Sequence, residues 1–129
     1  MTSEGLSYTF PKAERLSGKK EIEELFKRGS SFYLHPFIFR FLKSEKEVHH
    51  KVIFSVPKKK FKRAVDRNLL KRRLRESYRL NKHLLHNSQH FYYLGFVYIE
   101  KEIVPFSEIE SKLVKTLTRF AKQIADNED

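Results

Sequence analysis

The segment that most constrains the fold of this 129-residue chain is the run 91–99, which is apolar or aromatic at every position except Gly95. A strand with one face open to water alternates apolar and polar residues, whereas a strand buried on both faces reads as a continuous apolar run. We therefore expect this strand to be central in its sheet. A chain of this length is large enough to bury a real core and is expected to form one domain around that sheet.

The first half of the chain predicts a short helix followed by strands. Ser17 is a candidate N-cap, and the segment 21–28 places apolar residues at helical spacing. The run 30–42 has strand character, and Pro36 marks a bend or a strand edge within it, which leaves a short first strand before a longer one. After a polar connection, residues 51–56 form a further strand.

The second half predicts a helix in the charged segment 58–79 and another helix after Pro105, with Ser107 and Glu110 as a capping-box pair. The apolar residues of this last helix share one stripe: Ile109, Leu113, Leu117, Phe120 and Ile124. The element order is α-β-β-β-α-β-α, an α+β fold (an α/β sandwich) with helices on a mostly antiparallel sheet. We expect a single domain over residues 1–129, with 1–9 as a flexible arm and 126–129 as a frayed tail.

Positive charge is concentrated on one side of the helix expected within 58–79. At about 100° per residue, six polar side chains fall within an arc of about 140°: Arg67, Asn68, Lys71, Arg72, Arg75 and Arg79. Leu70, Leu74 and Tyr78 lie on the adjoining arc, where they can pack against a core. Only Glu76 interrupts the cationic side, whereas a solvated helix face usually interleaves acids and bases. The pattern favours a polyanionic partner.

The overall charge agrees with that partner. Lys and Arg number 27 against 16 Asp and Glu, a net charge of +11, which indicates a nucleic-acid binder. An anionic membrane surface is the competing target, but a membrane-binding helix needs a broad apolar face that is free to insert, and the apolar arc here is short. No stretch approaches the roughly 20 apolar residues of a membrane span. The absence of cysteine suits a reducing compartment, and we expect a cytoplasmic protein without a membrane partner.

Aromatic residues leave two interpretations open. The chain has 12 Phe and 6 Tyr, and many lie in expected strands, where aromatics usually belong to the core. Some of them can instead face a groove beside the basic helix and stack on unpaired bases. The sequence does not separate the two sets.

No self-sufficient catalytic site is evident. The six histidines lie mainly in polar connecting segments and lack the ligand spacing of a zinc site, so we expect them at the surface. No Ser-His-Asp order and no phosphate-binding glycine loop occur. We predict neither catalytic residues nor metal ligands on this polypeptide.

The residues Ala64–Glu76 closely resemble the Arg-Asn-x-x-Lys-Arg-x-x-Arg signature of the protein component of bacterial ribonuclease P. The run Phe10–Leu16 and the order of the strands and final helix are also similar to that family. The resemblance implies a protein cofactor of a catalytic RNA that removes the 5′ leader from precursor tRNA, in a 1:1 complex with that RNA. It also implies Mg²⁺ held mainly by the RNA, with none bound tightly by the protein. The implied fold is ribosomal protein S5 domain 2-like, with a left-handed β-α-β crossover.

The resemblance assigns two sets of residues. Those expected to contact the catalytic RNA match the signature or share its helix face: Arg67, Asn68, Lys71, Arg72, Arg75 and Arg79. Those expected to line a groove for the leader come from the first helix, a strand and the loop before the basic helix: Ile22, Phe26, Arg40, Lys58, Lys59 and Lys60. Ile22 and Arg40 stand where members of the family often carry aromatics, so Arg40 is expected to make a phosphate or cation–π contact instead. Asn68 has a structural alternative, as a cap or a loop brace, and the three lysines have the alternative of a solvated loop.

Two other functions share this charge and size. A structural RNA-binding protein of ribosomal type would need no leader groove. A DNA-binding module would place its basic helix in a major groove, but such modules are mostly helical, and the apolar strands argue against one. The signature favours the ribonuclease P function.

Overall fold

A four-stranded sheet forms the centre of the molecule in the computed structural model, which describes residues 8–127. Its strands are β1 (Ser30–Leu34), β2 (Phe37–Ser44), β3 (Lys51–Ser55) and β4 (Phe91–Tyr98). The spatial order is β1-β2-β4-β3, in which β1–β2 and β2–β4 are antiparallel and β3–β4 is parallel. The mostly antiparallel sheet and the central position of the apolar strand are therefore confirmed.

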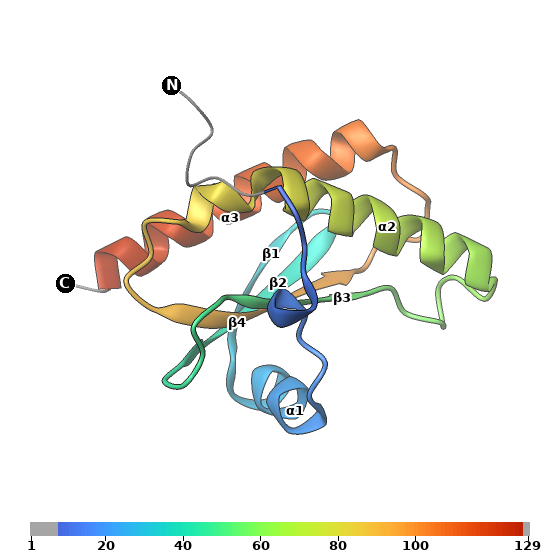
Figure 1. Ribbon diagram of the computed structural model, residues 1–129. Helices are drawn as coiled ribbons and strands as arrows, with labels where there is room; N and C mark the ends of the chain where they lie inside the picture. Colours follow the sequence, from blue (N-terminus) through green and yellow to red (C-terminus); the bar gives the residue numbers. More distant parts are fainter. Residues whose placement is uncertain (1–7, 128–129) are drawn as a thin grey trace.

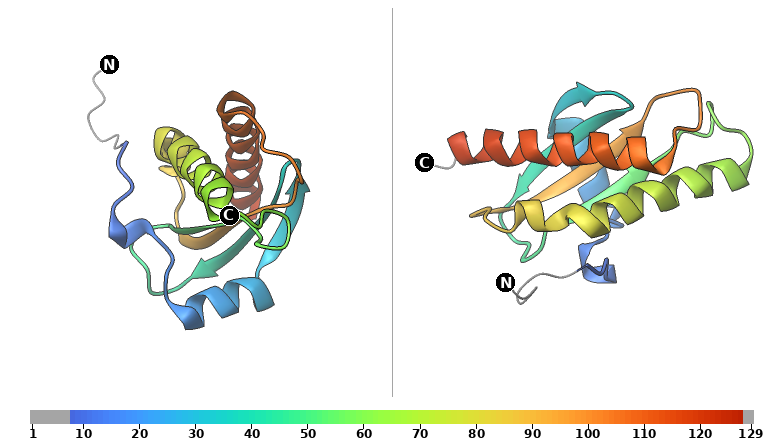
Figure 2. Two further views of the ribbon diagram at one scale, coloured as in Figure 1. Left: turned by 90° about the vertical axis from the view of Figure 1, so that its right-hand side faces the viewer. Right: turned by 90° about the horizontal axis from the view of Figure 1, so that it is seen from above.

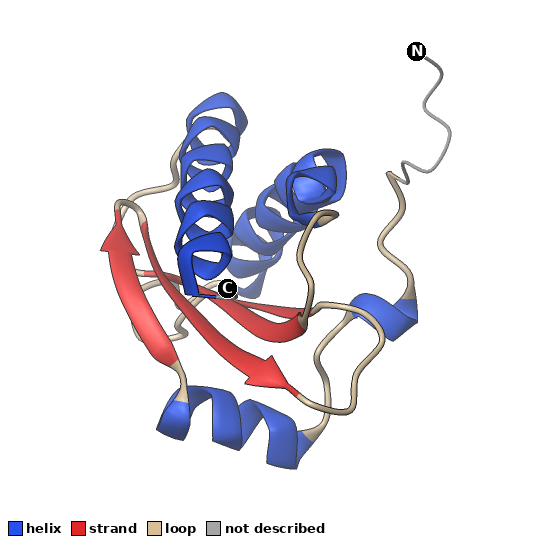
Figure 3. Ribbon diagram, turned by 90° about the vertical axis from the view of Figure 1, so that its left-hand side faces the viewer, coloured by secondary structure: helices blue, strands red, loops and turns tan. Residues whose placement is uncertain are grey.

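The two faces of the sheet are covered unequally. Helices α2 (Ala64–Asn81) and α3 (Phe106–Asn127) lie side by side on one face, and α1 (Lys19–Arg28) crosses the other (Figures 1 and 3). Two short 3₁₀-helices, η1 (Lys12–Glu14) and η2 (Lys82–Leu85), complete the described elements. This arrangement explains why β4 is apolar on both faces, since each face has a helix layer against it.

Alternation along β4 divides the core in two. Leu94 and Phe96 point into the main core beneath α2 and α3, where they meet the apolar stripe of α3 and the buried Leu70 and Leu74 of α2. Tyr93 points the other way and forms a small second core under α1. The expected burial of Leu70, Leu74, Tyr78 and the α3 stripe is confirmed.

Helix α2 is the connection between the parallel strands β3 and β4. Seen from the helix side, with both strands running to the right, β4 lies on the β2 side above β3 (Figure 2, right), so the crossover is left-handed. Such connections are right-handed in about 98% of cases. The hand implied by the family resemblance is therefore present.

Helix ends differ from the expectation. The N-cap of α1 is Gly18 rather than Ser17, and no side chain caps it. Ser107 lies inside α3, whose first turn instead donates to the carbonyl oxygen of Pro105 from the backbone N–H groups of Glu108 (3.1 Å) and Ile109 (3.0 Å). The capping-box prediction is wrong because α3 begins at Phe106, so Ser107 already lies within the first turn and cannot be its N-cap. In the tail expected to fray, residues 126 and 127 are still helical.

Candidate nucleic-acid interface

The outward face of α2 carries the predicted cationic residues because Leu70, Leu74 and Tyr78 fix its opposite side in the core. Four residues of the predicted set form no hydrogen bond or ion pair within residues 8–127: Asn68, Lys71, Arg72 and Arg75. Arg72 and Arg75 are exposed, as is Asn68, which neither caps the helix nor braces a loop. These side chains are available to an external partner.

The other two predicted residues are partly engaged within the protein. Arg67 Nη1 donates to the carbonyl oxygens of Phe61 (2.7 Å) and Lys62 (2.8 Å), which holds the loop before the helix. Arg79 donates to the carbonyl oxygen of Tyr8 (2.6 Å) and pairs with Glu76. A guanidinium has five N–H donors, so each retains donors for a partner, but each also has a structural role.

On the opposite face of the sheet, α1 lies close to β4 because Gly95 has no side chain. A Cβ at Gly95 would lie 3.1 Å from Leu25 Cδ2 of α1. Leu25 is fully buried there, whereas Phe26, the next residue, is 38% exposed, and Ile22 is half-buried beside the small core. The predicted groove residues Ile22 and Phe26 therefore line one flank of α1.

Arg40 of β2 joins this flank to the sheet. Its Nη2 donates to the carbonyl oxygens of Phe26 (2.8 Å) and Gly29 (3.3 Å), at the C-terminal end of α1. Its guanidinium also lies 5.5 Å from the centre of the Phe26 ring. The expected cation–π contact is therefore made within the chain, where Arg40 caps the last carbonyls of α1 and positions Phe26.

Sequence reasoning did not single out Tyr33, an exposed aromatic residue on the same face of the sheet as Arg40. Tyr33 pairs with Ile38 across the β1–β2 ladder, and Ser31 pairs with Arg40, so Tyr33 and Arg40 lie on the same face as diagonal neighbours. The Tyr33 side chain is 57% exposed. The signal that would have identified it is the alternation with half-buried Phe32, which packs on the α3 side.

The loop lysines have two different roles. Lys58 and Lys59 are exposed and form no ion pair with any described residue, whereas Lys60 Nζ donates to the carbonyl oxygen of Ile99. Near Ile99, His35 Nε2 lies 2.6 Å from Glu100 Oε2. The hydrogen bond with His35 is the main reason that the pKa of Glu100 is below its ordinary value. Lys60 is therefore partly structural, and two of the three predicted lysines are unengaged.

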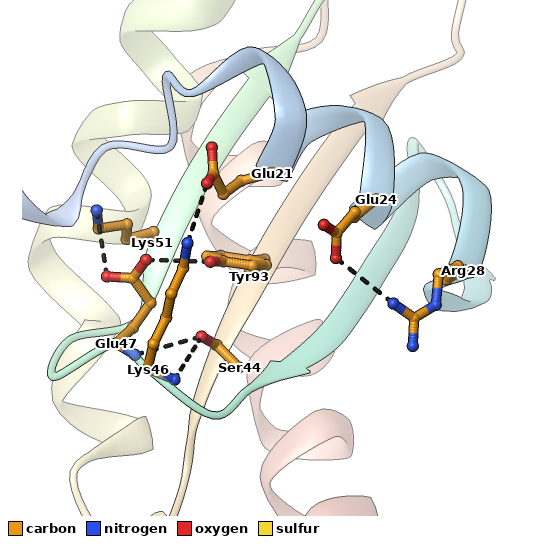
Figure 4. A network of polar contacts seen from close by, with 8 residues as sticks. All are labelled: Glu21, Glu24, Arg28, Ser44, Lys46, Glu47, Lys51 and Tyr93. Atoms are coloured by element: carbon orange, nitrogen blue, oxygen red, sulfur yellow. Dashed lines mark hydrogen bonds and ion pairs between the residues drawn. The ribbon is translucent and has the colours of Figure 1, made fainter.

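The other flank of α1 has mixed charge and is internally paired (Figure 4). Lys46 pairs with Glu21 (3.2 Å), Lys51 with Glu47 (3.2 Å), and the Tyr93 hydroxyl donates to Glu47 (3.0 Å). A backbone hydrogen bond and then the Lys46 hydrogen bond lower the pKa of Glu21. This flank presents neutralised charge, in contrast to the aromatic and cationic flank of Phe26 and Arg40.

The histidines were expected at the surface, and four of them line an open cavity of about 330 Å³ at the C-terminal end of α2. They are His49, His50, His83 and His86. Nevertheless, no group of three or more His, Cys, Asp or Glu residues within 8–127 is arranged to hold a metal ion. None of the helices in that range is long and apolar enough to cross a membrane.

Known proteins resemble this chain over nearly its whole length. A family model described as Ribonuclease P matches residues 10–121. A ribonuclease P protein component from Porphyromonas gingivalis is 35% identical over 124 residues, which are 92% of this chain and 90% of the relative. One from Citrifermentans bemidjiense is 34% identical over 120 residues, 92% of this chain and 98% of the relative.

Solved structures agree with the fold. The RNase P protein from Thermotoga maritima superposes with a TM-score of 0.69 at 28% identity, covering 82% of this chain and 96% of that one. The Staphylococcus aureus RNase P protein gives a TM-score of 0.70 at 22% identity over 86% and 97% of the two chains, which is a likeness of fold. The family match includes α1, β1, β2 and α2, which carry all the predicted RNA-contacting and leader-contacting residues except the three loop lysines, and it includes that loop as well.

Proposed function

The chain belongs to the ribonuclease P protein family, and we propose that it docks on the catalytic RNA through α2 and holds the 5′ leader of precursor tRNA beside α1. It is the protein subunit of ribonuclease P, the endoribonuclease that matures the 5′ end of tRNA. Catalysis is carried out by the RNA subunit. The contribution of the polypeptide is therefore to bind and position RNA.

Docking through α2 is supported by the unpaired cationic side chains of that helix. Arg72 and Arg75 are exposed and unengaged by the residues that the structure describes, and Arg can bind phosphate through two parallel hydrogen bonds. Each neutralised phosphate releases counterions, so the affinity falls steeply with salt. Asn68, which is also exposed, adds neutral hydrogen-bonding capacity on the same face.

Leader binding beside α1 is supported by the exposure of Phe26 and Tyr33 on the face of the sheet opposite α2. Aromatic rings next to cationic side chains bind single strands with little sequence preference, because every base has a face to stack. Arg40 holds Phe26 in place, while Ile22 adds an apolar contact. Lys58 and Lys59 extend positive charge toward the leader phosphates.

The metal requirement is assigned to the RNA. Because the described residues do not form a cluster of metal ligands, we propose that Mg²⁺ is held mainly by the RNA and is not bound tightly by the polypeptide. The protein promotes ion binding indirectly, by fixing substrate phosphates near the sites of the RNA. We further propose a 1:1 complex with the RNA in the cytoplasm.

The test is cleavage of a 5′-leader precursor tRNA by a bacterial ribonuclease P RNA at low, near-physiological Mg²⁺, with and without this protein. Correctly placed cleavage only when both are present is the expected result. Cleavage by the protein alone would contradict an RNA active site. Tight RNA binding without stimulation, with a cognate RNA tried, would indicate a structural RNA-binding protein of ribosomal type.

A further inference from the structure

A second basic stripe runs along α3, outside the surfaces assigned above. Its four residues follow at intervals of three, four and three positions: Lys112, Lys115, Arg119 and Lys122. At about 100° and 1.5 Å per residue, they fall within an arc of about 80° and span about 15 Å. The sequence has no acidic residue between Glu110 and Asp126. The stripe is therefore a continuous cationic surface with acids only at its two ends.

The stripe faces away from α2. Asn81 of α2 donates to Glu110 of α3 (3.0 Å), which marks the flank of α3 that meets α2. On the helix wheel, Glu110 lies about 160° from the centre of the stripe. On the stripe side, the Arg119 guanidinium lies 4.0 Å from the centre of the Phe32 ring of β1. The stripe thus overlooks the β1 edge, whereas α2 lies toward the β3 edge (Figure 2, left).

The charges of the stripe are not neutralised within the protein. None of its four residues forms an ion pair with another residue in 8–127, whereas basic residues elsewhere, such as Lys46, Lys51 and Lys82, are paired with glutamates. The strands beside it add no acid, because none occurs between Arg28 and Glu45. A helix face that serves only solubility usually interleaves both signs.

We propose that this outer flank of α3 is a second RNA-binding surface, which contacts the phosphate backbone of the same catalytic RNA that docks on α2. The inference rests on the proposed function. Helices α2 and α3 cover one face of the sheet, and the leader groove lies on the other face, so a large RNA that covers the helix face meets both basic flanks. Two contacts made by one RNA reinforce each other through effective concentration.

The absence of cysteine makes a mapping experiment direct. Three single-cysteine variants carry a tethered Fe–EDTA probe in the reconstituted complex with ribonuclease P RNA and precursor tRNA. Thr118→Cys reports on the α3 flank, Val65→Cys (59% exposed) on the α2 face, and Val48→Cys (70% exposed) on the connection between β2 and β3. We expect the Thr118 probe to cut the catalytic RNA at nucleotides different from those cut by the Val65 probe.

The outcomes separate the two proposals. Cutting from Val65 without cutting from Thr118 would refute the α3 surface and leave the proposed docking intact. Cutting of the precursor tRNA alone from Thr118 would also refute it, since the partner would be a different RNA. Cutting from neither position would refute docking through α2.

A charge variant gives an independent measurement. The triple variant Lys112→Gln, Lys115→Gln and Lys122→Gln leaves the contact of Arg119 with the Phe32 ring intact. We expect it to make the slope of log affinity for RNA against log salt concentration shallower by about two to three units. The matched control removes the same charge from three separate elements, as Lys27→Gln, Lys43→Gln and Lys101→Gln, and should change the slope by less than about one unit. Equal slopes in two variants with unchanged circular dichroism would refute the proposal.

Discussion

At the scale of single residues, the proposed leader site depends on two exposed aromatic rings. Phe26 is fixed by Arg40, and Tyr33 stands on the edge strand beside it. Neither ring is needed to fill the core, because 38% of Phe26 and 57% of Tyr33 remain exposed. Their exposure is what the proposed binding of a single strand requires.

We expect Phe26→Ala and Tyr33→Ala each to weaken binding of precursor tRNA relative to mature tRNA by about 1–3 kcal/mol, or about 5- to 150-fold. The physical reason is the loss of one stacked base. Dissociation constants of both tRNAs with the reconstituted enzyme measure it. Ile103→Ala, at another exposed apolar residue, should leave the ratio unchanged. Equal losses for both tRNAs in a folded variant would exclude leader stacking.

Arg72 and Arg67 provide a matched pair on one helix. Arg72→Gln should make the salt slope of RNA affinity shallower by about one unit without changing stability, because Arg72 has no partner among the described residues. Arg67→Gln should lower the free energy of unfolding by about 1 kcal/mol, since it removes the contacts to Phe61 and Lys62. Salt titrations and urea unfolding of both variants measure the difference. A stability loss in Arg72→Gln alone would reverse these roles.

At the scale of elements, the position of α1 depends on the missing side chain at Gly95. Leu25 packs where a Cβ would stand, and the same helix turn presents Phe26 to the groove. We therefore expect a side chain added at Gly95 to shift α1 and Phe26, and to leave α2, on the opposite face of the sheet, in place.

Gly95→Ala should destabilise the protein by about 1 kcal/mol through overpacking and should reduce the preference for precursor over mature tRNA. Affinity for the catalytic RNA should stay unchanged. Urea unfolding and the two tRNA affinities measure the effects. The double variant with Leu25→Val, which relieves the contact, should be less destabilised than the sum of the single variants. Strict additivity would show that the 3.1 Å approach to Leu25 Cδ2 does not matter.

Element type was predictable from the sequence where periodicity is strong. The α3 stripe of Ile109 to Ile124 and the apolar run of β4 are decided by burial alone, and both predictions are confirmed. Helix ends were less predictable, because α3 begins directly after Pro105 without a capping side chain that would mark its start in the sequence. The alternation of Tyr33 with Phe32 places the two on opposite faces, but the position of Tyr33 beside Arg40 follows from the β1–β2 pairing, which was not predicted.

The predicted site residues divide in the same way. The cationic side of α2 follows from helical geometry, so Arg72 and Arg75 were predictable. The contacts of Arg79 with Tyr8 and of Arg40 with Phe26 were not, because the fold brings these backbone acceptors close, and those of Arg67 depend on the conformation of the loop just before the helix. Residue type and spacing carry no information about such acceptors.

At the scale of the whole molecule, a net charge of +11 on 129 residues opposes the compact state through self-repulsion. We expect partner RNA to reduce that repulsion and to bind the folded form, which presents the α2 face, more tightly than the unfolded chain. At RNA concentrations about 100 times the Kd, stability should rise by about 2.7 kcal/mol. Hydrogen exchange of the β4 amides, which should slow about 100-fold, measures this gain. Slowing confined to α2 would show that binding does not reach the sheet.

The left-handed β3–α2–β4 connection links folding of the protein to its assembly with the RNA. The helix proposed to bind the RNA is also the main part of the connection between the two parallel strands, since α2 lies between β3 and β4 in the chain. A chain in which this crossover has not formed does not present the cationic face of α2 in its final orientation. We therefore expect assembly with the RNA to favour chains in which the β3–α2–β4 crossover has formed over chains in which it has not.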